Sequence, residues 1–299
     1  MELDSHLVGS GLKEYRKEIG WRETMNYAAA VGDNNSCYFD DEQLDGIIAP
    51  PMFCVAVTWP VTEKLDEFLE PGLLPAEISA TKVHYTEHIE FHRPVKPGDI
   101  LAVKGKIAAI LPHRAGAHII IRYDVSDDRG KPVFTEHIGA LLRNVKCTDS
   151  GRGDETLPPV PACGSKSGSI WEATLPVDPM SPFIYDGCTN IFFPIHTSKQ
   201  FAKMVGLPGI ILQGTATLAF AVKELINREA GGNPRCLKVL SCRFTGMVIP
   251  GTEIRIQLID KINRENDKEL FFAVTNSEGR KAISNGYALI KKHPCFLSA

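Results

Sequence analysis

The sequence lacks several features that would place it in common classes of protein. Its 299 residues contain no uninterrupted apolar run long enough to cross a bilayer, and residues 1–20 lack the basic start and apolar core of a signal peptide. Positive charge is scattered rather than gathered in a patch, and the formal net charge is −3. We therefore expect neither a membrane nor nucleic acid as a partner.

Disulfide and phosphate-loop motifs are also missing. The eight cysteines include no Cys-x-x-Cys pair, and disulfide frameworks belong mainly to small secreted chains, so the pattern favours reduced thiols in a cytoplasmic protein. The short run Gly9-Ser10-Gly11 lacks the Lys-Ser/Thr ending of a phosphate-binding loop.

A histidine-rich run gives a weak indication of metal binding. Alternation along a strand would place four polar residues on one face, namely His84, His88, Glu90 and His92. Histidines spaced in this way can bind zinc, but a third well-spaced ligand of defined geometry is missing. We interpret the run as a polar outer face, with Tyr85, Ile89 and Phe91 turned inward, and expect no metal or other cofactor.

The most informative stretch runs from Ser181 to Phe220. Residues 185–195 form an aromatic-rich segment that we expect to be a turn region, and His196 follows it. Thr197 or Ser198 can then cap a short helix. After a buried extended run at residues 210–212, the apolar spacing predicts a second helix from Thr215 to about Asn227.

This order of elements resembles the MaoC-type dehydratases and type 2 enoyl-CoA hydratases. Members of that family commonly read Gly-Asp-x-Asn-Pro-x-His, then a small helix, then Pro-Gly-x-Ile-x-His-Gly. The matching residues here are Pro194, His196, Pro208, Gly209, Ile211 and Gly214, with Gln213 in place of the second histidine. The resemblance implies a hot-dog fold, in which a curved antiparallel sheet wraps a long helix and acyl thioesters bind beside the N-terminus of that helix.

The turn before His196 departs from the family pattern. The family has an aspartate five residues before the histidine, where this chain has Ile191. A turn one residue longer would bring Asn190 nearest to that place, and Asp186 is the only carboxylate nearby. A subset of these hydratases has such a longer turn, with Thr and Asn before the histidine. Spacing leaves open which of Asn190 and Asp186 faces the substrate.

A second, altered copy of the motif is present in the first half of the chain. Asp33 and Asn35 match it, whereas Tyr38 replaces the histidine, and an apolar helix is expected at Met52–Phe68. Without the histidine, Asp33 and Asn35 are expected to stabilise a turn rather than to form a working site. The resemblance implies that this half lends its groove to the acyl tail.

Alternating segments that suit strands follow each copy of the motif. They cover residues 100–110, 118–125 and 133–145 in the first half and residues 253–259, 270–275 and 282–291 in the second. We predict an α+β double hot-dog fold with an N-terminal unit at 1–147, a Gly-, Ser- and Pro-rich linker at 148–169, and a C-terminal unit at 170–299. Two fused units would cover an open sheet edge and imitate a homodimer.

The chemistry implied by the resemblance is the reversible addition of water to an enoyl-CoA thioester. Gly214 would start a helix whose free N–H groups stabilise the enolate-like oxygen, and His196 would act as the base. Asn190 can only orient water, so Asp186 is the alternative proton carrier. Tyr185, Pro194, Gln213 and Gly214 form the expected substrate-binding set. Alternatively, His196 caps a helix and Gly214 is a packing glycine.

Two other functions stay open at this point. Hot-dog proteins also include acyl-CoA thioesterases, for which Thr215, Thr217 or Glu224 would supply the catalytic group. The missing aspartate in the second half and the missing histidine in the first would also suit a non-catalytic acyl-CoA-binding subunit. Either a homodimer or a pairing with a partner hot-dog subunit is compatible with the sequence, which leaves the acyl chain of the substrate undefined.

Overall fold

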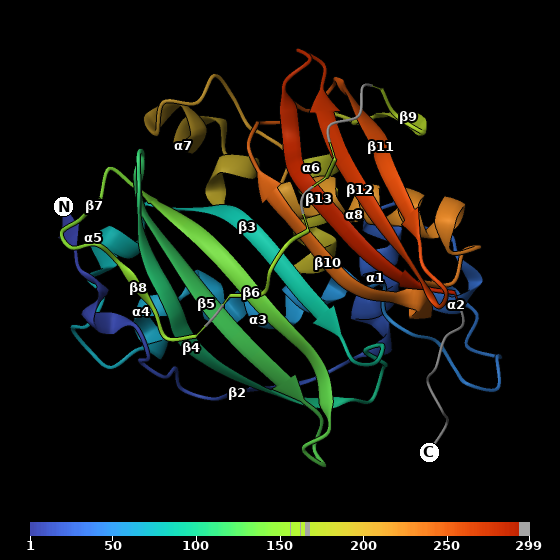
Figure 1. Ribbon diagram of the computed structural model, residues 1–299, viewed down its shortest axis with the longest axis horizontal. Helices are drawn as coiled ribbons and strands as arrows, with labels where there is room; N and C mark the ends of the chain where they lie inside the picture. Colours follow the sequence, from blue (N-terminus) through green and yellow to red (C-terminus); the bar gives the residue numbers. More distant parts are fainter. Residues whose placement is uncertain (156, 162, 165–167, 293–299) are drawn as a thin grey trace.

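The computed structural model describes residues 1–155, 157–161, 163–164 and 168–292 of the chain. Within them, one antiparallel sheet of eleven strands has the order β2-β4-β5-β6-β3-β10-β13-β12-β11-β9, with β8 paired to β4 (Figure 1). The strands of the first half are β2 (Tyr15–Glu18), β3 (Lys82–Phe91), β4 (Ile100–His113), β5 (Gly116–Ser126), β6 (Pro132–Arg143) and β8 (Arg152–Gly153). Those of the second half are β9 (Trp171–Pro176), β10 (Leu237–Phe244), β11 (Glu253–Asn263), β12 (Asp267–Asn276) and β13 (Lys281–Lys291).

The helices gather mainly on one face of this sheet (Figure 1). The α-helices are α1 (Trp21–Ala30), α2 (Ser36–Phe39), α3 (Phe53–Glu63), α4 (Leu65–Phe68), α5 (Ala76–Ser79), α6 (Ser181–Thr189), α7 (Lys199–Met204) and α8 (Gly214–Glu229). Three 3-10 turns, η1 (Ser5–Leu7), η2 (Pro194–His196) and η3 (Pro234–Cys236), and a small parallel pair, β1 (Glu2–Leu3) with β7 (Lys146–Cys147), complete the elements. Among the described residues, every helix is too short or too polar to span a bilayer.

The two halves of the chain meet where β3 pairs with β10. This pairing is antiparallel, with Ser241 opposite His88 and Leu240 opposite Ile89, and it joins the two predicted units into one continuous sheet. Each half contributes one long apolar helix, α3 or α8, to the same side of the sheet. The predicted double hot-dog fold is therefore confirmed, while the exact unit boundaries stay a prediction.

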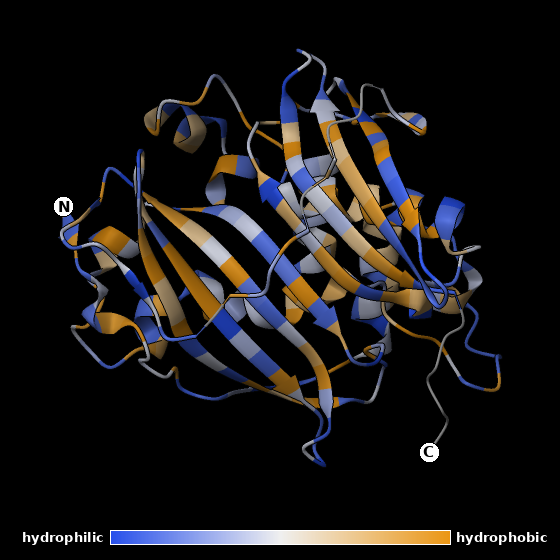
Figure 2. Cartoon of the chain, in the orientation of Figure 1, coloured by the Kyte–Doolittle hydropathy of each residue, from blue (hydrophilic) through white to orange (hydrophobic). Residues whose placement is uncertain are grey.

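The alternation of residue types explains why the predicted strands form. Along β11, Ile254, Ile256 and Leu258 are fully buried, while Glu253 and Arg255, which alternate with them, are exposed. Figure 2 shows the same alternation of polar and apolar residues along neighbouring strands. Because successive side chains of a strand point to opposite faces, one face packs on the helices and the other remains polar.

The segment predicted as a turn region at residues 185–195 is in fact largely helical. Helix α6 covers Ser181–Thr189, with Pro182 in its first turn, and Tyr185 and Thr189 are buried on one face. The i, i+4 spacing of Tyr185 and Thr189 produces this face. Asn190 ends the helix in the left-handed conformation at φ 56°, which asparagine tolerates better than most residues.

The histidine-rich strand also differs from the prediction, because its register shifts between His84 and Thr86. The shift places His84 beside Glu87, with 3.1 Å between Nε2 and Oε2, and turns Tyr85 toward the rings of His113 and His118. His84 therefore does not share a face with His88. Side chains of the described residues do not assemble three metal ligands in binding geometry.

A pair of carboxyl groups is buried in the core where the two halves meet. Glu87 and Glu136 are 1% and 0% exposed. Burial raises the pKa of Glu87 to about 8, and burial together with the neighbouring charge of Glu87 raises the pKa of Glu136 well above its usual value. The pair therefore carries at least one proton at neutral pH. Burial lowers the pKa of the adjacent His84 to about 4, so its imidazole is neutral.

Candidate active site

The imidazole of His196 is fixed by a hydrogen bond to the main chain. His196 closes the 3-10 turn η2, which proline favours at its start, and its Nδ1 lies 2.8 Å from the carbonyl oxygen of Ile211. A carbonyl oxygen only accepts, so Nδ1 carries the proton and Nε2 keeps a free lone pair in the neutral ring. The local geometry thus presents one ring nitrogen as an acceptor of protons.

Burial keeps this imidazole neutral. It lowers the pKa of His196 to about 4, and the hydrogen bond to Ile211 opposes the shift. Charged groups of the described residues do not contribute to the shift, so His196 has no ion-pair partner there. At neutral pH the side chain is therefore available as a base.

The bond to Ile211 also holds His196 next to the segment that leads into helix α8. Ile211 precedes Gly214, the first residue of α8, by three positions, and a second contact joins the Ile211 N–H to the Ile195 carbonyl at 3.4 Å. The side chain of Gln213, which precedes α8, makes no capping hydrogen bond, and the first N–H groups of an α-helix have no intrahelical partner. The structure therefore brings the turn of His196 together with the segment that leads into Gly214.

Gly214 lies against an aromatic ring. A Cβ atom added at this position would be 3.1 Å from Cδ1 and 3.3 Å from Cε1 of Phe244, which is tighter than ordinary van der Waals contact. Phe244 in turn packs on His84, with 4.5 Å between ring centroids. A side chain at the start of α8 would have to push the Phe244 ring back by a few tenths of an ångström, whereas glycine lets the ring and the helix start pack closely.

Gln213 ties helix α8 to helix α6. Its side chain is 2% exposed, and Nε2 donates to the carbonyl of Pro182 at 3.0 Å, while Oε1 is buried without a partner among the described atoms. An unpaired buried oxygen costs about 1–3 kcal/mol. This glutamine stands where the family motif has histidine, and it holds the beginnings of the two helices together.

Tyr185 meets a tyrosine that the sequence analysis did not identify. The hydroxyl groups of Tyr185 and Tyr27 are 2.9 Å apart and both side chains are buried, and burial raises the pKa of Tyr185 to about 12. Tyr27 precedes Tyr38 by eleven residues, as Tyr185 precedes His196. The internal repeat therefore contained the signal for Tyr27, because equivalent positions of two repeats meet near their symmetry axis.

The three remaining predicted residues lie around the same turn. Asp186 is half-buried on α6, and burial raises the pKa of its carboxyl group. Asn190 is exposed, and its N–H donates to the carbonyl of Asp186 at 3.0 Å. Pro194 begins η2 and shapes the turn that holds His196. The structure places Asn190 in a helix-ending position and Asp186 in a more enclosed one.

The altered motif of the first half forms a structural turn, as predicted. Asp33 accepts from the N–H of Asn35 at 3.3 Å, and the Asn35 side chain accepts from the N–H of Cys37 at 3.2 Å, which caps helix α2. Tyr38, in the position equivalent to His196, is completely buried. In the first half, a core tyrosine therefore occupies the position that His196 has in the second half.

Comparisons with known proteins agree with this architecture. A family model described as "MaoC like domain" matches residues 170–281, and one described as "FAS1-like, dehydratase domain region" matches residues 6–136. The solved structure of a MaoC-like dehydratase from Phytophthora capsici superposes with a TM-score of 0.81 at 20% identity, covering 96% of this chain and 98% of the other.

Two curated relatives extend the comparison. Peroxisomal multifunctional enzyme type 2 of Drosophila melanogaster is 24% identical over 292 residues, covering 92% of this chain but 46% of the relative. Probable enoyl-CoA hydratase 2 of Dictyostelium discoideum is 25% identical over 250 residues, covering 82% of this chain and 79% of the relative. The chain thus spans about half the length of the Drosophila enzyme. The chain combines a FAS1-like dehydratase region in its first half with a MaoC-like dehydratase domain in its second, and together they form a double hot-dog fold.

Proposed function

We propose that this protein is a hydro-lyase that adds water reversibly to an enoyl-CoA thioester. The observation that carries the proposal is the Nδ1 contact of His196 with Ile211, which leaves Nε2 as a base just ahead of the uncapped start of α8. The names of the relatives, an enoyl-CoA hydratase 2 and a peroxisomal multifunctional enzyme, support this reaction class.

The proposed reaction needs a base, an oxyanion site and a returned proton. His196 Nε2 takes a proton from water, and the oxygen of that water adds to the β-carbon of the enoyl group. Negative charge that develops on the thioester oxygen is stabilised by the first N–H groups of α8, beginning at Gly214. The proton held by His196 is then returned to the α-carbon, so the imidazole is regenerated and no cofactor is consumed.

Asp186 is the better of the two candidate assisting groups. It is half-buried on α6, whereas Asn190 is exposed and its left-handed conformation ends that helix. Asp186→Asn is expected to lower turnover more than Asn190→Gly, because glycine keeps the left-handed conformation. A larger loss in Asn190→Gly would assign the assisting role to Asn190.

Turnover of an enoyl-CoA, followed by the loss of enoyl absorbance, tests the proposal. His196→Ala is expected to lower turnover by about 10²–10⁴ while binding of the thioester persists. A thiol reagent added to the same reaction distinguishes the thioesterase alternative, since only hydrolysis releases free CoA. Unchanged turnover in His196→Ala, or release of free CoA without hydration, would reject the hydratase. Assays with enoyl-CoA substrates of different chain length then identify the acyl group. Co-localisation with a compartment marker identifies where the protein lies in the cell, and its molecular mass in solution identifies the oligomeric state.

A further inference from the structure

A cavity lies on the sheet face opposite the long helices. It has a volume of about 470 Å³ and is formed between the strands at the junction of the two halves and the described linker residues Leu157, Pro158, Val160 and Pro161. The linker crosses this face in Figure 1. Cavities of this size hold small organic ligands in other proteins.

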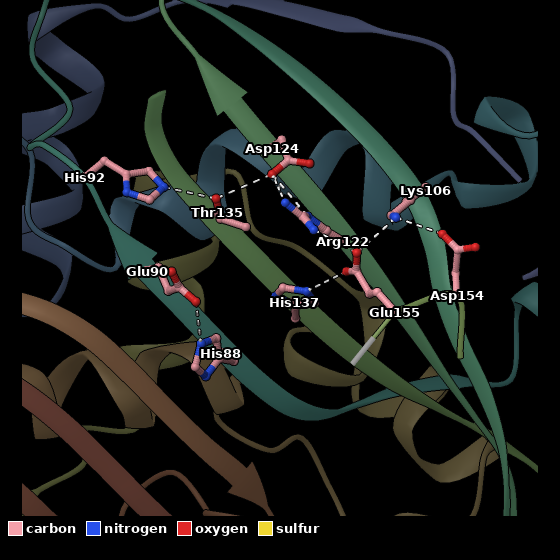
Figure 3. Close-up of polar contacts among 10 residues, drawn as sticks. All are labelled: His88, Glu90, His92, Lys106, Arg122, Asp124, Thr135, His137, Asp154 and Glu155. Atoms are coloured by element: carbon pink, nitrogen blue, oxygen red, sulfur yellow. Dashed lines mark hydrogen bonds and ion pairs between the residues drawn. The ribbon is translucent and has the colours of Figure 1, made fainter. Parts of the chain in front are cut away.

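The linker is fastened over this face by ion pairs. Glu155 accepts from Arg122 at 2.8 Å and from His137 at 3.2 Å, and Lys106 lies 3.0 Å from it (Figure 3). Although burial opposes the effect, hydrogen bonds from Lys106, His137 and Arg122 lower the pKa of Glu155 to about 2. The carboxylate therefore stays charged and holds one wall of the cavity against the sheet.

The lining of the cavity carries two cations and three imidazoles. The cations are Arg243 and Lys281, and burial lowers the pKa of each imidazole, those of His88, His118 and His137, so these rings are neutral at pH 7. Among the described lining residues the one acidic side chain is Glu87, which pairs with His84 and has its pKa raised to about 8 by burial. An anion would therefore meet positive groups without a competing carboxylate in the lining.

Two imidazoles present unpaired nitrogens in this region. His137 is 7% exposed, and its Nε2 bonds to Glu155, yet its Nδ1 is buried without a partner among the described atoms. His88, directly opposite on β3, has Nε2 3.5 Å from Glu90 and likewise an unpaired, buried Nδ1 (Figure 3). Buried polar atoms in folded proteins are normally paired, and these two nitrogens beside the cavity can still accept or, once protonated, donate a hydrogen bond.

Apolar residues complete the cavity. Ile120 and Phe271 lie on the sheet side, and Val160 faces them from the linker. A ligand that fills the space must therefore combine a charged head with an apolar body.

We propose that this cavity binds a small organic anion, with its carboxylate or phosphate head among Arg243, Lys281 and the paired histidines and its apolar body against Ile120 and Phe271. The site is separate from His196 and Gly214, because it lies across the sheet from α8. It does not rest on the proposed hydratase activity.

Anion binding at this site should take up protons. Nδ1 of a neutral imidazole holds a lone pair, so it must be protonated before it can donate to an anion. The charged and titratable groups that surround His88 and His137 are Glu90 on β3, Lys106 on β4, His118 and Arg122 on β5, Arg243 on β10, Lys281 on β13 and Glu155 on the linker. Binding is therefore expected to be tighter at about pH 6 than at about pH 8.

Calorimetric titration of the full chain tests the proposal with three matched probes. Octanoate carries a carboxylate and octyl phosphate carries a phosphate, each on an eight-carbon chain, and octan-1-ol has an uncharged eight-carbon chain. Either anion is expected to bind at least about tenfold more tightly than octan-1-ol, and the tighter anion identifies the preferred head. Equal affinity of octan-1-ol would overturn the proposal.

Variants locate the site. The double change Arg243→Gln and Lys281→Gln alters two exposed residues and is expected to weaken anion binding at least about tenfold, whereas Lys291→Gln on the same strand β13 leaves it unchanged. His137→Gln is expected to reduce the difference in affinity between the two pH values. His196→Ala should bind the anion like the unaltered chain. Binding lost in His196→Ala but kept in the double variant would place the anion in the active site and refute the outer site.

Discussion

The pH dependence of folding should carry the signature of the buried pair Glu87 and Glu136. Glu87 has a pKa of about 8 in the folded chain against a usual value of 4.5. A carboxyl group whose pKa is raised on folding contributes full stability below about pH 4.5, and that contribution is lost as the pH rises to about 8. At about 1.4 kcal/mol for each pKa unit, this loss is on the order of 5 kcal/mol.

The variant Glu87→Gln isolates this effect. Glutamine has nearly the same shape and does not titrate, so the free energy of unfolding of the variant relative to the unaltered chain should rise by several kcal/mol between about pH 5 and pH 8. Urea unfolding followed by circular dichroism at each pH measures this difference. The titration of His84 changes stability in the opposite direction, but it occurs in both proteins and therefore largely cancels in the difference.

Glu90→Gln is the matched control for this experiment. Glu90 lies on the same strand but is partly exposed, with a 44% exposed side chain, so its replacement should leave the pH dependence nearly unchanged. If Glu87→Gln and the unaltered chain lose stability in parallel as the pH rises, Glu87 is not protonated in the folded state, and the reasoning from its burial is refuted.

Three further predictions concern the candidate active site. His196→Ala should lower kcat/KM by about 10²–10⁴. Because burial lowers the pKa of His196 to about 4, the kcat/KM of the unaltered enzyme should fall on acidification only near pH 4. A fall in kcat/KM that begins near pH 6.5 would contradict this. Gly214→Ala should lower turnover by about 10², since its Cβ would press on Phe244 at 3.1 Å and displace the start of α8; unchanged kinetics would dismiss the tight fit. Tyr27→Phe and Tyr185→Phe should each lower the free energy of unfolding by about 1–3 kcal/mol, because each leaves the other hydroxyl buried without a partner. The double variant leaves no such hydroxyl and should lose less than the sum of the two single losses. Additive losses in urea unfolding would show that the two hydroxyls do not interact.

Much of the fold was predictable because its signals are periodic. Alternation located the six strands that follow the two motif copies, and the helix after Gly214 was expected within two residues of its observed ends. The turn of Asp33 was also foreseen, since short polar side chains that bond to nearby N–H groups leave a local signature.

Other features depend on contacts that spacing does not reveal. Helix α6 was taken for a turn because it is short and buries only Pro182, Tyr185 and Thr189, which is too few positions for a clear helical period. The register shift beside His84 reversed the faces expected for His84 and Tyr85, since a single extra residue inverts the alternation, whereas Ile89 is buried as predicted. The hydrogen bond from His196 to Ile211, which fixes the imidazole tautomer, joins residues 15 positions apart and has no pattern in the sequence.

The complete burial of Tyr38 has a consequence for stoichiometry. In an assembly of two identical hot-dog subunits each copy would offer its own histidine, but here the equivalent place in the first half is occupied by a tyrosine that packs in the core. On the proposed function, one chain would turn over a single thioester at a time, and active-site titration is expected to count one reactive centre per chain.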